Sequence, residues 1–380
     1  MKATLPLLSL IVLCVANILT ACTGSIGTPS APIVKVDLEK GREVTDTVLF
    51  EQTGIVILEV TDSSFIRNIN KVACLDTLIF ISDITENYIY VFNEHGKFLS
   101  RIGQLGQGPG EYSSLLDFAA DPKRNELILS TEAPRSLLFY SFSGDFLDKT
   151  PIPHNGTRIA LADNKVIAQE FGGGHRMSVF TLNNHRMAKI DTLDAPPITY
   201  GNYITVDGTC FTTSCDTIFY SRRFDNTLYI IQDGKIMPYV KFDFGPYSVT
   251  DENEASMDDV KRFLQVANMP NNVRIRGSRL LMNAYPFGLF TYDRVSGKTI
   301  HHGKVNHSTL KAAKDSRLRI KFGQMTASWS EDPSTVVFSA EAESVKLIAE
   351  RAEGLDPELR EKLVNLGEEA NPVLFFYRMR

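Results

Sequence analysis

The hydrophobic and polar positions of the chain follow a repeated pattern of short apolar segments. Six such segments recur: LIFISD at 78–83, ELILST at 126–131, KVIAQE at 165–170, TIFYSR at 217–222, RLLMNA at 279–284 and TVVFSA at 335–340. Successive segments begin 39 to 62 residues apart, which is close to the length of one four-stranded propeller blade plus insertions. The pattern predicts an all-β fold, a six-bladed β-propeller of four-stranded blades.

A second strand and a tight turn follow most of these segments. The turn positions carry glycine in four repeats and asparagine in a fifth: Gly96, Gly144, Gly234, Gly297 and Asn184. Glycine and asparagine adopt a positive φ angle at lower cost than other residues, as two-residue hairpin turns require. The turn residues therefore favour β-hairpins.

Two segments have helical rather than strand periodicity. In residues 342–369 the apolar side chains recur at helical spacing, and Asp356 followed by Pro357 is typical of a helix N-cap and first position. Residues 250–268 show a second helical pattern with an acidic first turn. We expect both as insertions in the propeller.

The two ends of the predicted propeller complement each other. The strand NPVLFFYRM at 371–379 follows the helices, but the last blade still lacks a strand, and IVILEV at 55–60 belongs to no other blade. We expect the N-terminal strand to complete the last blade, which closes the ring and leaves no long free sheet edge.

The N-terminus is typical of an export signal. Residues 1–21 contain a lysine and an apolar run, and residues 19–22 read Leu-Thr-Ala-Cys, as in the bacterial lipobox. This predicts cleavage before Cys22, lipidation of Cys22 and attachment to a membrane through its acyl chains. Residues 22–45 are then a lipidated, flexible tether, and residues 46–380 the propeller.

Composition excludes several classes of protein. The 380 residues are 43% hydrophobic and 22% charged, which excludes a disordered chain. With 40 Lys and Arg against 45 Asp and Glu, the net charge is −5, and no basic stripe is present. We therefore expect no nucleic-acid partner.

Three cysteines remain outside the signal region. Cys210 and Cys215 are spaced to bridge the base of a hairpin in an oxidising compartment. The alternative is that both, with Cys74, are buried free thiols. The paired spacing of a cysteine metal site is absent.

The segment GQLGQGPGEYSSLLDFAAD at 103–121 carries a resemblance to a known family. Together with the lipobox, the helical insertion and the closing strand, it resembles the six-bladed β-propeller lipoproteins of Bacteroidota, which have NHL-like repeats. The resemblance implies the propeller fold and a place in the cell envelope, but no activity. Residues 23–25 lack an acidic run, so it further implies the outer membrane, facing the periplasm.

The glycines of this segment are not those of a phosphate-binding loop. The Lys-Ser/Thr that follows such a loop is missing, and Glu111 stands where a phosphate would lie. We expect these glycines to permit a tight crossing between blades, with Tyr112 packed between them. The seven histidines form no metal-binding motif. We therefore assign no cofactor and no metal.

Charged residues at the ends of the repeated segments are the candidate ligand site. They would ring one mouth of the propeller channel, unless they form only a solvated rim: Asp83, Glu132, Glu170, Arg222 and Arg223. Trp329, the single tryptophan, precedes the sixth segment and is expected near a channel mouth. Its position allows a carbohydrate ligand.

The sequence contains no nucleophile motif such as GxSxG, and the catalytic residues, if any, are unknown. The preferred interpretation is a binding or scaffolding propeller for an envelope protein or glycan. The alternative is a periplasmic hydrolase, lactonase or lyase with its site at the channel mouth. A third is an assembly factor whose helices dock a partner.

Overall fold

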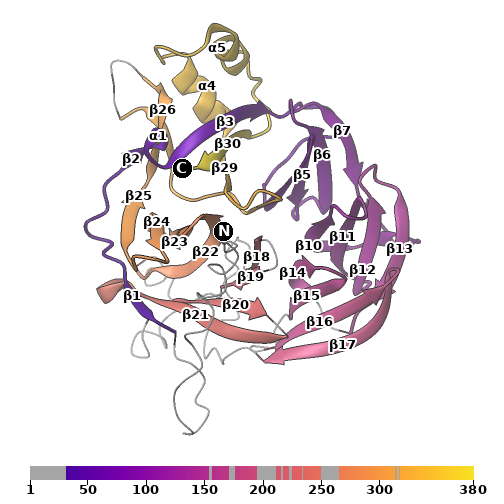
Figure 1. Cartoon of the computed structure of the whole chain (residues 1–380). Helices are drawn as coiled ribbons and strands as arrows, with labels where there is room; N and C mark the ends of the chain where they lie inside the picture. Colours follow the sequence, from indigo (N-terminus) through magenta and orange to yellow (C-terminus); the bar gives the residue numbers. More distant parts are fainter. Residues whose placement is uncertain are drawn as a thin grey trace, which may run out of the picture. The chain divides into compact units, whose positions relative to one another are not determined.

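The computed structural model describes residues 31–153, 156–170, 176–194, 211–214, 217–221, 225–232, 234–249, 265–312, 315 and 317–380. Within residues 31–380, which form one compact unit, most of the chain lies in small antiparallel sheets (Figure 1). This is the propeller fold expected from the sequence.

The first two sheets have their four strands in chain order. They are β4 (Lys71–Leu75), β5 (Leu78–Asp83), β6 (Tyr88–Asn93) and β7 (Phe98–Ile102), then β10 (Ser114–Asp121), β11 (Glu126–Glu132), β12 (Ser136–Ser141) and β13 (Phe146–Pro151). Between them lies the short parallel pair β8 (Gln104–Leu105) and β9 (Glu111–Tyr112).

The next three sheets repeat this order. They are β14 (Gly156–Ala162), β15 (Lys165–Glu170), β16 (Arg176–Asn183) and β17 (Arg186–Asp194); β18 (Phe211–Ser214), β19 (Thr217–Tyr220), β20 (Thr227–Gln232) and β21 (Lys235–Asp243); and β22 (Asn268–Arg276), β23 (Arg279–Tyr285), β24 (Gly288–Asp293) and β25 (Thr299–Gly303). A 3₁₀ turn, η1 (Gly245–Tyr247), follows β21.

The remaining strands form two three-stranded sheets and one parallel addition. β29 (Thr335–Ala340), β30 (Val373–Met379) and β3 (Phe50–Ile57) make one sheet, and β2 (Val44–Thr45), β26 (Val305–Lys311) and β27 (Arg319–Phe322) the other. β28 (Ser328–Ser330) pairs in parallel with β4. Each of the six apolar segments recognised in the sequence contains one strand of this set: β5, β11, β15, β19, β23 and β29.

The turn residues have the predicted conformation. The four glycines have φ between 68° and 97°. In the third hairpin, Asn184 and His185 both have positive φ, 45° and 64°. A pair of positive φ angles is what a two-residue hairpin turn needs, so Asn184 replaces glycine there without loss of the turn.

Strands from the two ends of the chain pair as predicted. β3 runs antiparallel to β30, with Phe50 opposite Met379 and Ile57 opposite Val373 (Figure 1). The N-terminal strand begins five residues earlier than the segment 55–60 expected from the sequence. It nevertheless supplies the missing edge of the last sheet.

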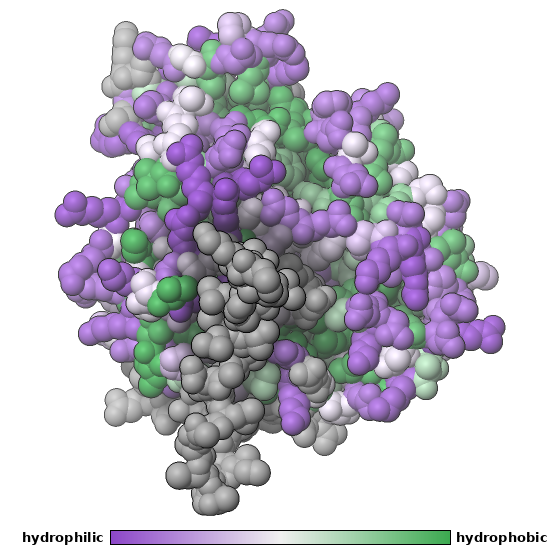
Figure 2. Space-filling model, viewed as in Figure 1, coloured by the Kyte–Doolittle hydropathy of each residue, from purple (hydrophilic) through white to green (hydrophobic). Residues whose placement is uncertain are grey.

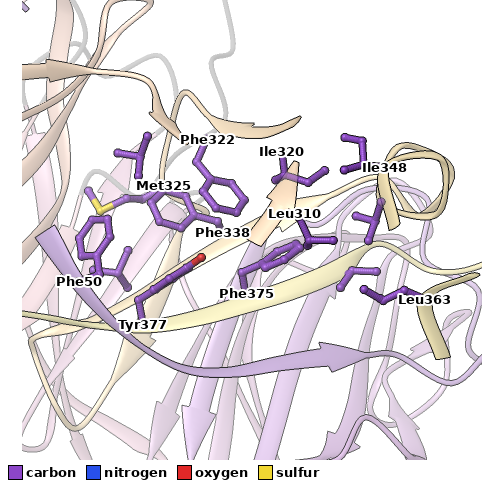
Figure 3. Close-up of a cluster of buried hydrophobic side chains, with 14 of the residues drawn as sticks. Phe50, Leu310, Ile320, Phe322, Met325, Phe338, Ile348, Leu363, Phe375 and Tyr377 are labelled. Atoms are coloured by element: carbon purple, nitrogen blue, oxygen red, sulfur yellow. The ribbon is translucent and has the colours of Figure 1, made fainter. Parts of the chain in front are cut away.

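The expected helical segment at 342–369 contains two helices, α4 (Ala342–Ala349) and α5 (Pro357–Val364). The Asp356 carboxylate accepts a hydrogen bond of 3.0 Å from the Leu359 N–H, and Pro357 is the first helical residue, which confirms the predicted cap. Ile348 of α4 and Leu363 of α5 join a buried cluster with Phe338 and Phe375 of the terminal sheet (Figure 3). The helix expected at 250–268 lies mostly outside the described residues, although its last residue begins β22.

The flexible tether was expected to extend to residue 45, and this is wrong for its second half. β1 (Ile33–Lys35) pairs in parallel with β21, β2 pairs in parallel with β26, and the four-residue helix α1 (Asp46–Leu49) follows β2. Val36 and Leu38 are buried against the fourth and fifth sheets. The folded unit therefore includes residues that the sequence assigned to a linker.

Candidate functional site

The first strands of neighbouring sheets enclose a pocket with a volume of about 150 Å³. Strands β10 and β14, β14 and β18, and β18 and β22 are in contact, and β28 lies against β4. All six of these strands contribute residues to the pocket wall. The pocket is therefore formed where the sheets converge.

Arg274 of β22 is the most deeply buried cation in this wall, with 4% of its surface exposed. Its Nη1 donates to the Val273 carbonyl at 2.9 Å, and its Nη2 donates to the carbonyl and the hydroxyl of Ser328, both at 2.6 Å. Burial lowers the pKa of Arg274 to about 10, an effect that Cys74 partly opposes. The guanidinium stays charged at neutral pH.

Lys71 of β4 also lines the pocket, but its charge is matched. Its Nζ donates to the Asp117 carboxylate at 3.1 Å and to the Phe118 carbonyl at 2.5 Å. The second oxygen of Asp117 accepts the Ile159 N–H at 2.8 Å. Asp117 therefore neutralises Lys71 and ties β4, β10 and β14 together.

The charges at the edge of the pocket are paired as well. Lys123 lies 3.2 Å from Asp163, and Arg124 lies 3.9 Å from Asp121. Another pair, 3.2 Å apart, joins Asp332 to an arginine of β30, Arg378. These pairs are exposed on at least one side, so each contributes little to stability, but together they leave the edge nearly neutral.

Aromatic and hydroxyl side chains complete the wall. Trp329 of β28 is half-buried, as the sequence expectation of a place near the channel mouth allows, and Phe118 and Phe211 line the pocket from β10 and β18. The hydroxyls come from Thr212, Thr213, Ser328, Ser330 and Thr335. Apolar walls with a few polar groups are typical of small-molecule sites.

A family model for a domain of unknown function, DUF4934, matches residues 31–378. The chain belongs to this family. No curated protein matches its sequence.

The solved structures that resemble the DUF4934 domain include two from Bacteroides species. A Bacteroides fragilis protein described as exported has a TM-score of 0.67 at 21% identity, covering 92% of this chain and 99% of its own. A member of the DUF4221 family from Bacteroides vulgatus has a TM-score of 0.50 at 9% identity, covering 87% of this chain and 98% of its own. At these identities the similarity supports the fold alone.

Two of the rim residues expected from the sequence of this DUF4934 domain can be compared with the pocket, and both lie away from it. Asp83 and Glu132 stand at the ends of β5 and β11, whereas the pocket edge carries residues that precede the repeated strands, such as Asp121 and Asp163. Neither Asp83 nor Glu132 lines the pocket. The mouth expected at the ends of the repeated strands is thus not where this pocket opens.

Asp83 has a structural role instead. It is fully buried, and its two carboxylate oxygens accept the N–H groups of Arg67, Asn68, Thr85 and Glu86 at 2.8 to 3.1 Å. Its carboxylate is therefore occupied by the backbone on both sides. Glu132 is exposed.

The other predicted site residues cannot be placed in the same way. The backbone of Glu170 ends β15, while its side chain lies outside the described residues. Arg222, Arg223, Cys22, Cys210 and Cys215 also lie outside them.

The glycine-rich segment has the conformation expected of a crossing between sheets. Tyr112 is fully buried in a cluster that joins the first two sheets, and its hydroxyl donates to the Asn87 carbonyl at 2.7 Å. The Glu111 carboxylate accepts the Gly108 N–H at 2.7 Å. A carboxylate of the chain thus takes the N–H that a phosphate would need.

The DUF4934 domain shows no metal site in the part of the chain that the structure describes: no three His, Cys, Asp or Glu side chains are grouped there. Among the same residues no helix is long and apolar enough to span a membrane. On the face shown in Figure 2, hydrophobic areas are separated by hydrophilic ones. The pocket is therefore the best-defined candidate site.

Sequence reasoning missed Arg274 and Lys71. In the segment VRIRG, Arg274 alternates with apolar residues, a pattern that predicts a strand with its polar face in water. In a propeller, that face of a first strand points instead toward the neighbouring first strands. The sequence signal that could have identified these two residues is a charged side chain within the first strand of a predicted blade.

Proposed function

We propose that this protein is a lipid-anchored lipoprotein of the cell envelope, held at the periplasmic face of the outer membrane through Cys22. It acts as a binding or scaffolding β-propeller with six blades. Its partner is an envelope protein or glycan, of which one group enters the pocket between the innermost strands.

The observation that carries this proposal is the composition of the pocket. Strands from every side of the unit bring aromatic, hydroxyl and charged side chains to one small cavity, and a rigid scaffold that presents such a set is suited to binding. The Bacteroides fragilis relative described as exported and the lipobox support the location. Six repeated segments with one strand each support the blade number.

The enzymatic alternative gains no specific support from the pocket. The feature that would distinguish a hydrolase, lactonase or lyase is a cluster of His, Asp or Glu side chains at the axis with a bound cation. Among the described pocket residues, the carboxylates are engaged by cations instead. We therefore propose binding alone.

Binding is tested with the mature lipidated protein, purified in non-ionic detergent. Saccharide and peptide fractions of the envelope are titrated while the emission of Trp329, the only tryptophan, is followed, and heats are measured by calorimetry. Ser330→Phe places a ring at the pocket wall and should abolish binding, while Ser63→Phe, at an exposed turn, should not. If no fraction binds the wild-type protein, or if Ser330→Phe binds normally, this function is refuted.

Location is tested separately. Cys22→Ser should move the protein from the detergent phase to the aqueous phase in a phase-partition assay and should remove acyl chains from its mass. A wild-type protein of unmodified mass would contradict the anchor without bearing on the pocket.

A further inference from the structure

We propose that the pocket recognises a carboxylate, that Arg274 is its anchor, and that the ligand group is an acidic sugar residue. The inference rests on the proposed function, because it names the ligand of the same pocket.

Arg274 has donors that the described residues do not satisfy. Three of its five N–H groups donate to Val273 and Ser328, which leaves the Nε–H and one Nη1–H without an acceptor there. Donors of a buried charged group are costly to leave unpaired. A ligand oxygen in the pocket would satisfy them.

Arg274 also lacks a charge partner. Its hydrogen bonds go to two carbonyls and a hydroxyl, and no carboxylate in the described part of the chain forms an ion pair with it. Among the described residues, Cys74 is the one ionisable group that acts on its pKa, and this thiol is neutral at pH 7 because burial raises its own pKa to about 12. A buried charge is normally paired.

The other cations near the pocket differ in this respect. Lys71 is matched by Asp117, and Lys123 by Asp163. Among the described residues around the pocket, one positive charge, that of Arg274, is therefore left for a ligand with one negative charge. A carboxylate supplies one charge and two acceptor oxygens that form short charge-assisted hydrogen bonds with a guanidinium.

The rest of the wall favours a sugar as the carrier of that carboxylate. Trp329, which is half-buried, offers aromatic surface for the C–H face of a ring, and the hydroxyls of Thr212, Thr213 and Ser330 suit sugar hydroxyls. A volume of about 150 Å³ has room for on the order of ten water molecules. That is space for one sugar residue at the end of a chain.

The test compares glucuronate with its neutral amide, glucuronamide, and with glucose, by calorimetry and Trp329 emission. These probes share the ring and differ in charge. We expect glucuronate to bind at least tenfold more tightly than either neutral sugar, with an affinity that falls as salt rises. Equal binding of glucuronate and glucuronamide would overturn the inference, and this comparison needs no variant.

The anchor is tested with Arg274→Gln and, as a matched control, Arg294→Gln at an exposed turn. Arg274→Gln should lose at least tenfold in glucuronate affinity and little in glucose affinity, whereas Arg294→Gln should bind glucuronate like the wild type. Unchanged glucuronate binding by a folded Arg274→Gln protein would refute the anchor.

The outcomes separate the two proposals. Binding of neutral saccharides in the pocket without preference for glucuronate refutes the acidic sugar and leaves the binding function intact. A short peptide that binds through its C-terminal carboxylate more tightly than glucuronate refutes the sugar as carrier. No binding of any saccharide or peptide refutes both proposals.

Discussion

The hydroxyl of Tyr377 on the last strand donates a 3.0 Å hydrogen bond to the carboxylate of Asp46, which lies 331 residues earlier in the chain. Both side chains are about 1% exposed. The other oxygen of Asp46 accepts the Thr47 N–H at 2.7 Å. Burial, and next the charge of Asp46, raise the pKa of Tyr377 far above its usual value, so the phenol remains a donor and holds α1 against β30.

Tyr377→Phe should therefore destabilise the protein. It leaves one oxygen of a buried carboxylate without its donor, and the expected loss is roughly 1–3 kcal/mol in the free energy of unfolding. Chemical denaturation measures it. Tyr239→Phe is the control, because no hydrogen bond of its hydroxyl to the described residues is found, and it should change stability by less than about 0.5 kcal/mol. Equal effects of the two variants would contradict the role of Asp46.

Stability should fall with acid because two histidines are buried in neutral form. Burial lowers the pKa of both His302 and His307 to about 4, helped in His302 by the neighbouring His301 and opposed in His307 by Asp46. The Nδ1 of His307 accepts the N–H groups of Thr309 and Leu310 at 3.2 and 3.1 Å, so a proton there would break both bonds.

The pH window follows from the direction of these shifts. The folded state binds these protons less readily than the unfolded chain, whose histidines titrate near 6.5. The stability that the two neutral histidines contribute is therefore fully present above about pH 6.5. It is lost as the pH falls toward 4, by up to about 3 kcal/mol per histidine. Unfolding free energies measured from pH 4.5 to 7.5 should show this slope, and His302→Gln should reduce it while exposed His95→Gln should not. A flat profile would contradict the buried neutral state.

Two turn glycines should differ in their tolerance of alanine. Both have positive φ, 81° at Gly96 and 68° at Gly297, which costs an alanine about 1–2 kcal/mol. A Cβ at Gly96 would also meet the Ile57 carbonyl oxygen at 2.1 Å, whereas at Gly297 it meets nothing within 4 Å. Gly96→Ala should lower the urea midpoint clearly more than Gly297→Ala, by a further 1–3 kcal/mol in stability. Similar midpoints would contradict this prediction, because they would mean that the Ile57 carbonyl of β3 moves away from the added Cβ at little cost.

Thiol counting decides between a Cys210–Cys215 disulfide and free thiols at these two positions, the alternatives that the sequence leaves open. Because burial raises the pKa of Cys74 to about 12, this thiol should not react in the folded protein. After unfolding without reductant, the mature lipidated chain should show one reactive thiol if Cys210 and Cys215 are bridged, and after reduction three. Cys74→Ala should remove the one seen without reductant. Three thiols without reductant would rule out the disulfide.

The strand repeats could be predicted because residues close together in the sequence specify each strand and each turn. Most repeated segments are apolar runs followed by a second strand that ends at a turn residue such as Gly144 or Asn184, so neighbouring residues specify both strands and the turn. The pairing of β3 with β30 could also be predicted, because the last sheet lacked one strand and the N-terminal segment contained a strand that belonged to no other sheet.

The parts that the sequence did not predict depend on distant partners. β1 and β2 have three and two residues, too few to show an alternation of apolar and polar positions. They form because the edges of β21 and β26, more than 200 residues away in the chain, are open to them. The same holds for Arg274, whose place in the pocket follows from the approach of β28. Local pattern specifies the sheets, while the site arises from how they converge.

The pairing of β3 with β30 also has a consequence for the order of folding. The residues joined, such as Phe50 and Met379, are among the most distant contacts of the folded unit, and contacts of such separation are slow to form. In a chain that emerges N-terminus first, β3 stays unpaired until all the strands between it and β30, and β30 itself, have been made. An apolar strand left open for so long is an aggregation hazard, so a chain truncated before β30 should depend on chaperones far more than the full-length protein does.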